Sequence, residues 1–342
     1  MELSRNQYIT RKELTKMKPL YLDSTTGEVY CQEDIELADG KRNWSERKKM
    51  SLDVASLMRQ YDRERSEKIR QCGTYLEFAV APEGRKLHHA NFCRERMCPM
   101  CQWRRTIKLR VQADRIYAAE TARGYQHIFV TLTMRNMVGS ELSPALDQMC
   151  AAFAKWTRHK AFKASFLGYY RAIEVTHNDT DDTYHPHIHV MLTVSDDYFR
   201  PDNPDYWTHD RIMDTWRQLL QLDYDPTVHV EGVRPKEGQT ITAACVELCK
   251  YPTKSAQLKS SFVLQTVDYA LRNRRLIQWG GLTADIRREL QLDDIESGNL
   301  IHTDDATADG VDLPTVTYVW RHGFYCPMDL KTLILANAEE HT

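Results

Sequence analysis

The sequence has none of the long apolar runs that lead a chain into or across a membrane. Residues 1–18 are polar and charged, unlike an apolar leader, and no run approaches the roughly 18 apolar residues of a membrane span. A phosphate-binding loop of the type G-x₄-G-K-[S/T] is also absent, which argues against a built-in helicase. We therefore expect a cytoplasmic protein without a membrane partner.

The chain has almost no excess of charge of either sign. Its 46 Lys and Arg residues face 48 Asp and Glu residues, for a formal net charge of -2, so overall charge neither favours nor excludes a nucleic-acid partner. Basic residues nevertheless gather in two local clusters, and each could bind a phosphate backbone or form a solvated helix face. The first cluster comprises Arg94, Arg96, Arg104, Arg105, Lys108 and Arg110, and the second comprises Arg272, Arg274 and Arg275.

The nine cysteines are odd in number, and three of them lie close together in the sequence. This pattern fits reduced thiols and a metal site better than disulfides. Cys98 and Cys101 have the spacing of a zinc knuckle, and the best fourth ligand is Cys72, with His88 or His89 as the alternative. The predicted structural zinc ligands are Cys72, Cys93, Cys98 and Cys101.

A basic run with one tryptophan follows the cysteines directly and suits contacts to DNA backbone and bases. The predicted DNA-contact residues are Arg94, Arg96, Trp103, Arg104 and Arg105. Around this run we divide the chain into four parts. They are an N-terminal segment (1–60), a zinc-binding basic segment (61–110), a catalytic domain (111–282) and a C-terminal extension (283–342). The N-terminal segment is polar, with Trp44 isolated among charges, and we expect a mobile arm or a loosely packed helical segment there.

Helical and strand periodicities alternate in the central part of the chain. The expected helices span 106–120, 143–162 with Ser143 as N-cap and Pro144 in the first turn, 210–222 and 240–257. The expected strands span 127–134, 169–176, 186–194 and 227–233, and a further strand is expected at 315–320. The order strand, helix, strand, strand, helix, strand predicts an α+β fold with a ferredoxin-like antiparallel sheet that carries both crossover helices on one face.

The most informative motif is the pair His187 and His189, separated by one apolar residue within an apolar, β-branched run. Alternate residues of a strand point the same way, and two residues span only about 7 Å, a good spacing for two ligands of one metal ion. His185 shares that face and is a candidate fourth ligand or a group that supports the ligands by contacting them. The alternative is that these histidines are half-buried sheet residues that hydrogen-bond to their neighbours.

A carboxylate is expected on the same face, across a hairpin. If the turn is centred between Thr180 and Asp181, Glu174 lies opposite His187, and a shift of one residue places it opposite His189. Two histidines and a carboxylate therefore converge in either register. Such a set leaves coordination positions open for water or substrate oxygen, as a catalytic metal site requires.

A second group of chemically active residues surrounds Tyr251. Glu247 lies four residues before it, and Lys254 follows three residues later. Residues four apart meet on a helix surface, although Pro252 favours a kink at this point. A free tyrosine has a pKa near 10, so a metal and an ammonium group would be needed to offset its weak nucleophilicity. The alternative is a packed tyrosine with its hydroxyl group in water.

Three segments resemble, in the same order, the three motifs of rolling-circle plasmid replication initiators, which belong to the His-hydrophobic-His endonucleases. They are TLT at 131–133, HPHIHV at 185–190 and ELCKYPTK at 247–254. The segment CRERMCPMCQWRR at 93–105 looks like one found upstream in one subgroup of these initiators. The resemblance covers roughly residues 72–256, and the combination of motifs is much more specific than any single one.

The resemblance implies site-specific nicking and rejoining of single-stranded or hairpin origin DNA by Tyr251. A covalent 5′-phosphotyrosyl intermediate would form, and the free 3′-hydroxyl would prime synthesis with a host helicase and polymerase as partners. Glu247 maps onto the glutamate that activates water for the terminating cleavage. Lys254 would contact the scissile phosphate or the phenolate.

The resemblance also assigns the metal site. His187 and His189 map onto the ligands of a divalent cation, Mn²⁺ or Mg²⁺, and Glu174 maps onto the usual third ligand. The alternatives are a transposase or relaxase with the same chemistry and a non-catalytic, zinc-stabilised nucleic-acid-binding regulator. Relaxases usually place their tyrosine before the histidine motif, whereas Tyr251 follows it.

Overall fold

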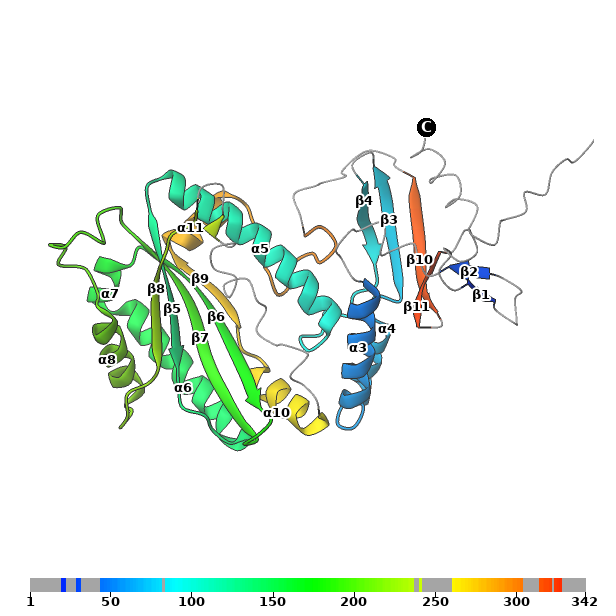
Figure 1. The fold of residues 1–342 in the computed structure, drawn as a ribbon, viewed down its shortest axis with the longest axis horizontal. Coiled ribbons are helices and arrows are strands. Elements are labelled where there is room, and N and C mark those ends of the chain that lie inside the picture. The colour runs from blue at the N-terminus through cyan, green and yellow to red at the C-terminus, as the bar shows by residue number, and fades with distance from the viewer. Residues whose placement is uncertain are drawn as a thin grey trace, which may run out of the picture.

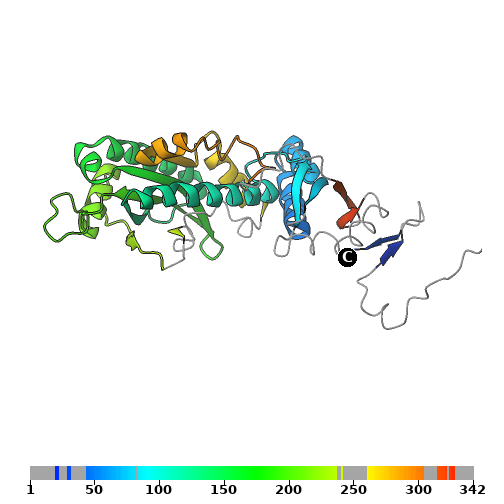
Figure 2. The same ribbon diagram turned by 90° about the horizontal axis from the view of Figure 1, so that it is seen from above.

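The computed structural model describes residues 20–22, 29–31, 44–81, 84–236, 240–241, 260–303, 314–321 and 323–327. These residues form an α+β fold with a five-stranded sheet, a four-stranded sheet and a short two-stranded sheet, all antiparallel. Two views show an elongated molecule in which the two larger sheets lie apart and one long helix, α5 (Pro99–Ala122), runs between them (Figures 1 and 2). Within the described part of the chain, no helix is both long and apolar enough to cross a membrane.

The five-stranded sheet contains the four strands predicted in the central part of the chain, with their ends shifted by a few residues. Its strand order is β8-β5-β7-β6-β9. The strands are β5 (Gln126–Thr133), β6 (Gly168–Asn178), β7 (Thr183–Val194), β8 (Val228–Val233) and β9 (Ile277–Gly281). Strand β9 pairs with only the first part of β6, so residues 173–178 of β6 form an outer edge.

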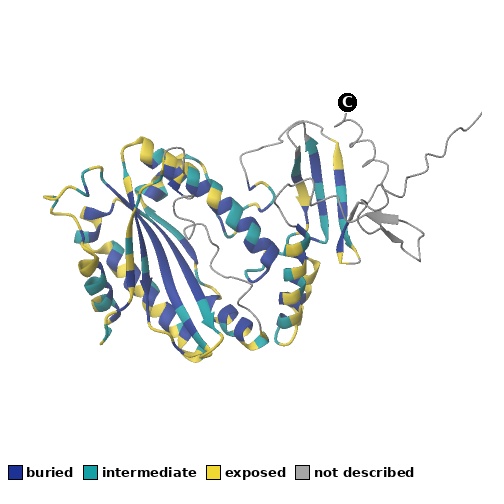
Figure 3. Ribbon diagram, in the orientation of Figure 1, coloured by how far each residue is buried: buried dark blue, intermediate teal, exposed yellow. Residues whose placement is uncertain are grey.

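Helices cover the two faces of this sheet differently. One face of the sheet packs against α6 (Gly139–Arg158). Arg171 of β6 pairs with Val190 of β7, so their side chains lie on the same face, and Arg171 contacts the Cys150 sulfur of α6 at 3.5 Å. Ile188 and the other alternate residues of β7 therefore face α6 as well. Among the described residues, α5 and α11 contact the opposite face at the end that holds Thr193. The sheet helices are α6 (Gly139–Arg158), α7 (Lys160–Ser165), α8 (His209–Leu220), α10 (Ser261–Leu271) and α11 (Leu282–Glu289). The central strands are buried along most of their length (Figure 3).

The expected helix at 143–162 differs from the observed one at both ends. Helix α6 begins at Gly139, so Ser143 is not its N-cap, and Pro144 lies inside it. A proline costs only one backbone hydrogen bond there, to the Ser140 carbonyl, and Ser140 is exposed to water that can replace it. The helix ends at Arg158 because His159 adopts an extended backbone and caps α7.

The four-stranded sheet joins distant parts of the sequence in the order β11-β10-β3-β4. The expected strand at 315–320 is present as β10, and it pairs with β3. Part of the expected C-terminal extension thus belongs to the same sheet as the expected zinc-binding segment. The strands are β3 (Tyr75–Ala81), β4 (Gly84–Ala90), β10 (Thr315–Arg321) and β11 (Phe324–Pro327), and the two-stranded sheet consists of β1 (Leu20–Leu22) and β2 (Val29–Cys31).

The N-terminal part also contains the helices α3 (Trp44–Met58) and α4 (Arg63–Gln71). The expectation of a loosely packed segment is wrong for α3, because Trp44 is fully buried. Its ring lies 4.6 Å from that of Trp103 and 5.6 Å from that of Phe78. Four consecutive charged residues, 46–49, follow Trp44 closely in the sequence, and this concealed the side of α3 that packs inward.

Candidate functional site

The hairpin formed by β6 and β7 has the first of the two registers expected from the sequence. Glu174 pairs with His187, and the next residues on that face pair as Ala172 with His189 and Thr176 with His185. Because side chains directly opposite each other lie about 5 Å apart, this register brings the carboxylate to the two imidazoles.

The three predicted ligands meet at a single carboxylate oxygen. Oε2 of Glu174 lies 3.2 Å from Nε2 of His187 and 3.0 Å from Nε2 of His189. All three side chains are buried, so water screens their charges poorly. One ligand atom from each lies within 4.8 Å of the others, as residues that hold a metal ion require.

The other ring nitrogen of each imidazole, Nδ1, lies within hydrogen-bond distance of a second group. Nδ1 of His187 lies 3.3 Å from the His185 carbonyl oxygen, which can only accept a hydrogen bond, so Nδ1 carries the proton there. Nδ1 of His189 lies 3.1 Å from Oγ1 of Thr131, and the Phe129 ring stacks on this imidazole with a centroid distance of 5.5 Å. Such partners fix the ring orientation and leave Nε2 as the ligand atom.

This arrangement points lone pairs at one another. With its proton on Nδ1, His187 presents the Nε2 lone pair to the Glu174 carboxylate oxygen, and the two repel unless a cation lies between them. Nε2 of His189 lies within hydrogen-bond distance of the same oxygen. The donor set therefore fits a divalent cation with open coordination positions. Sequence reasoning gave no role to Thr131, although its place in the TLT segment beside the histidine strand was a usable signal.

The histidine His185 stands apart from this group. It is half-buried, its ring centroid lies 5.5 Å from that of His187, and it is not among the three residues whose ligand atoms converge. Burial and the neighbouring His187 lower the pKa of His185, which favours its neutral form. The structure therefore gives no support to its predicted role as a fourth ligand.

Four cysteines form a second cluster beside the start of α5. The Cys101 sulfur lies 3.6 Å from that of Cys72 and 3.8 Å from that of Cys93, and the Cys98 sulfur belongs to the same group. The backbone N–H of Cys93 donates to the Cys72 sulfur at 3.4 Å, a bond that favours a thiolate. Cys72 is thus the fourth thiol, whereas His88 and His89 are exposed on β4. The set fits a tetrahedral ion such as zinc.

Lys48, which the sequence gave no reason to select, lies beside these thiols. Its side chain is fully buried on α3, and its ammonium group donates to the carbonyl oxygens of Arg70 at 2.6 Å and Cys72 at 2.7 Å. Burial lowers the pKa of Lys48, and the neighbouring cysteines raise it. Four thiolates and one divalent ion leave a net charge of -2, which a buried ammonium group partly offsets.

A family model described as a replication protein matches residues 84–324, well over half of the chain. The chain belongs to this family. The Protein rep of Bacillus amyloliquefaciens is 35% identical over 323 residues, which cover 84% of this chain and 94% of that protein. The Protein rep of Streptococcus pneumoniae serotype 2 (strain D39 / NCTC 7466) is 35% identical over 272 residues, which cover 77% of this chain and 84% of that protein. A Replication protein of Staphylococcus aureus is 36% identical over 187 residues, which cover 52% of this chain and 79% of that protein.

These matches confirm that the chain is a plasmid replication initiator, as the motifs indicated. The family match spans both clusters of metal-ligating residues except Cys72, which precedes it. No solved structure matches the chain at a significant level. The predicted nucleophile Tyr251, its neighbours Glu247 and Lys254, and residues 242–257 of the expected helix lie outside the described residues.

The predicted DNA-contact residues of this replication protein lie mostly inside it. Arg104 and Arg105 are buried, and the Trp103 ring packs against Trp44. Arg96 donates to the carbonyl oxygens of Leu271 and Arg274, and only Arg94 is exposed. The prediction that Arg104 and Arg105 contact DNA is therefore wrong for this structure, because their guanidinium groups already bond to protein carbonyls.

Arg105 donates to the carbonyl oxygens of Arg94, Glu95 and Glu296, and the carbonyls that Arg104 contacts belong to residues 293–303, a segment that we call the strap. Arg104 donates to the carbonyl oxygens of Leu300 at 2.8 Å and Ile301 at 2.7 Å. Lys108 donates to the carbonyl oxygens of Asp294 and Asn299, both at 3.0 Å, and pairs with the Asp293 carboxylate. The basic face of α5 thus holds the strap that precedes β10.

Replacing Arg104 with methionine tests this structural role. We expect the free energy of unfolding to fall by about 2–4 kcal/mol, because buried carbonyl oxygens of the strap lose a charged donor. Affinity for single-stranded DNA, measured well below the melting temperature, should stay within about twofold. Arg110→Met is the matched control, since Arg110 is exposed on the same helix. A variant that unfolds like the parent but binds DNA weakly would restore the DNA-contact role.

Proposed function

We propose that this replication initiator starts rolling-circle replication by nicking one strand of origin DNA with Tyr251, assisted by a divalent cation. The observation that carries the proposal is the convergence of two imidazole nitrogens on one oxygen of the Glu174 carboxylate, in a chain whose family replicates plasmids. Glu174, His187 and His189 would hold the cation. When bound, Mn²⁺ or Mg²⁺ would polarise a phosphodiester oxygen as a Lewis acid.

The topology of the five-stranded sheet supports the same proposal. Numbered along the chain, the four predicted strands lie in the order 4-1-3-2, which is the order of a ferredoxin-like unit, and β9 adds one strand at the edge. We propose that this sheet is the core of a His-hydrophobic-His endonuclease. Its two central strands, β5 and β7, then carry the TLT and HPHIHV segments side by side.

In the proposed reaction the Tyr251 hydroxyl oxygen attacks the scissile phosphorus. A tyrosine oxygen–phosphorus bond forms as the bond to the 3′-oxygen breaks, and that oxygen leaves with a proton as a free 3′-hydroxyl. Lys254 would stabilise the charge that develops on the phosphate or the phenolate. A host polymerase would extend the 3′-hydroxyl while a host helicase opens the duplex.

The final cleavage needs a different nucleophile. Glu247 would act as a general base, taking a proton from a water molecule that attacks the second phosphodiester. Termination by hydrolysis explains why one tyrosine suffices. Zinc bound by Cys72, Cys93, Cys98 and Cys101 would hold the start of α5 and the neighbouring strands in place without entering the reaction.

The proposal is tested with labelled single-stranded oligonucleotides from a panel of candidate origin sequences, incubated with Mn²⁺ or Mg²⁺. We expect a shorter labelled product and a denaturation-resistant protein–DNA adduct. The Tyr251→Phe variant should form no adduct, because it lacks the attacking oxygen, although it should still bind the DNA. An adduct that persists in this variant would exclude Tyr251 as the nucleophile. If no sequence in the panel gave any adduct, the regulator that binds nucleic acid without cutting it would be favoured.

A further inference from the structure

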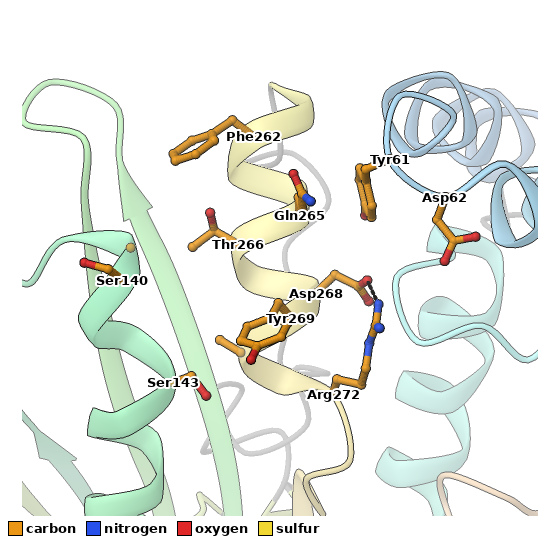
Figure 4. A pocket seen from close by; sticks show the side chains of 12 residues that line it. Tyr61, Asp62, Ser140, Ser143, Phe262, Gln265, Thr266, Asp268, Tyr269 and Arg272 are labelled. Atoms are coloured by element: carbon orange, nitrogen blue, oxygen red, sulfur yellow. Dashed lines mark hydrogen bonds and ion pairs between the residues drawn. The ribbon is translucent and has the colours of Figure 1, made fainter.

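Helix α10 and its neighbours enclose a cavity of about 580 Å³ that the proposed reaction does not use. Phe262, Thr266 and Tyr269 of α10 point toward the first turns of α6, where Ser140 and Ser143 lie (Figure 4). The opposite wall comes from the corner between α3 and α4, with Tyr61 and Asp62. We call this cavity and its rim the α10 groove.

The aromatic side chains of the groove are unusually open to solvent. Phe262 is 63% exposed and Tyr269 is 68% exposed, the highest values among the exposed large apolar side chains of the described residues. They are seven residues apart, so they lie on one side of the helix with their backbones roughly 10 Å apart along its axis. Exposed aromatic rings in such a row offer flat faces on which nucleobases can stack.

Arginines gather at the end of the groove near Tyr269. An adjoining pocket of about 410 Å³ is lined by three arginines, one aspartate and one asparagine. The aspartate, Asp268, is buried and already engaged by Arg65 at 2.5 Å and by Arg272 at 3.1 Å. Arg272 borders both pockets, and its side chain is half exposed. Glu95 pairs with Arg65 at 2.8 Å and Glu296 with Arg96 at 3.7 Å, so the half-exposed Arg272 is the cation of this group that a phosphate can reach.

The groove lies beside the end of the β6–β7 hairpin, on the face of the sheet that α6 covers. A Cβ atom on Gly139 of α6 would lie 2.9 Å from Thr266 of the groove and 3.2 Å from the Tyr184 ring, so these residues meet. Tyr184 precedes His187 by three residues, roughly 10 Å along β7, so the two side chains lie on opposite faces of the sheet. At the outer edge of β6, the N–H of Ile173 donates to the Leu276 carbonyl oxygen at 3.0 Å, next to Glu174.

We propose that the α10 groove binds single-stranded DNA, with unpaired bases stacked on Phe262 and Tyr269 and a phosphate on Arg272. This proposal rests on the proposed nicking function and assigns a binding surface to it. A duplex cannot use the groove in this way, because its bases are already stacked on one another. The groove therefore distinguishes a melted origin from closed DNA.

The test measures binding in the Tyr251→Phe background, so that the DNA stays intact. Fluorescence anisotropy is recorded with a fluorescein-labelled 20-nucleotide strand and with the duplex of the same sequence. Phe262→Ala and Tyr269→Ala should each weaken binding of the single strand by about 5- to 100-fold. Affinity for the duplex should change less than about twofold. Tyr206→Ala is the matched control, because Tyr206 is 43% exposed outside the groove.

Arg272→Gln gives an independent readout. It should reduce the slope of log affinity against log salt concentration by about 0.7, the value for one phosphate contact on a single strand. Arg288→Gln on α11 is the control, since Arg288 is also exposed and paired with a neighbouring aspartate. Circular dichroism checks that each variant is folded.

The outcomes distinguish a failure of the groove proposal from a failure of the proposed nicking function. If the wild type forms the Tyr251 adduct but the Phe262→Ala/Tyr269→Ala double variant binds the single strand within about twofold of its parent, the groove proposal alone is wrong. Equal losses for single strand and duplex would also overturn it, because stacking would not be the cause. If the parent binds no single strand and forms no adduct, the proposed function fails together with it.

Discussion

Replacing His189 with alanine is expected to lower the rate of origin nicking at least about a thousandfold. Nε2 of His189 faces the shared Glu174 oxygen at 3.0 Å, and its loss leaves one histidine and one carboxylate to hold the cation. A cation that polarises a phosphodiester contributes several kcal/mol to the transition state, and about 4 kcal/mol corresponds to a factor of a thousand. Single-turnover cleavage of a labelled origin oligonucleotide gives the rate.

The same variant should lose its response to added metal. Mn²⁺ is expected to raise the melting temperature of the parent and to leave that of His189→Ala unchanged, because only the parent gains a ligand that binds the folded state. His209→Ala is the control, since this histidine is half exposed at the start of α8. Undiminished nicking by His189→Ala would show that the two imidazoles are structural sheet residues.

Replacing Cys98 with serine is expected to remove the ion from the cysteine cluster and to destabilise the protein by more than about 3 kcal/mol. Binding energy at a structural zinc site is folding energy, because the site does not exist in the unfolded chain. Cys98 caps the first turn of α5, and Cys72 follows α4, so the ion would join the two helices. Metal analysis of the purified protein and thermal unfolding measure the two effects.

Cys150→Ser provides the control for that experiment. Cys150 is a free, partly buried cysteine on α6, outside the cluster, so its replacement should leave the metal content unchanged. Loss of zinc from Cys98→Ser with nicking retained per folded molecule would agree with a purely structural ion. Equal zinc content in Cys98→Ser and in the parent would remove the zinc assignment.

The sequence was sufficient to predict that the side chains of Glu174, His187 and His189 converge. A strand repeats every two residues, so His187 and His189 had to share a face whatever the rest of the fold. The polar turn between β6 and β7 restricted the register to two choices, and Glu174 reached the histidines in both. These inferences succeeded because they depend on local geometry that the surrounding protein does not alter.

The roles of the basic residues could not be predicted in this way. Arg104 and Arg105 look like a DNA-binding pair in the sequence, yet they hold the strap almost two hundred residues further along. Trp44 looked isolated, but its aromatic partners Trp103 and Phe78 come from α5 and β3. A charged side chain has the same sequence pattern whether it meets phosphate or protein carbonyls, and only the tertiary structure supplies the partner.

The sequence by itself thus determined the family, the four central strands of the five-stranded sheet, and the residue types in both clusters of possible metal ligands. It did so because metal ligands and strand periodicity are written in short segments. The tertiary structure alone decided that Cys72 completes the thiol cluster beside a buried Lys48, and that β10 returns to pair with β3. It also placed Phe262 and Tyr269 beside Arg272. These arrangements depend on contacts between distant segments, whose closeness follows from the packing of the whole chain.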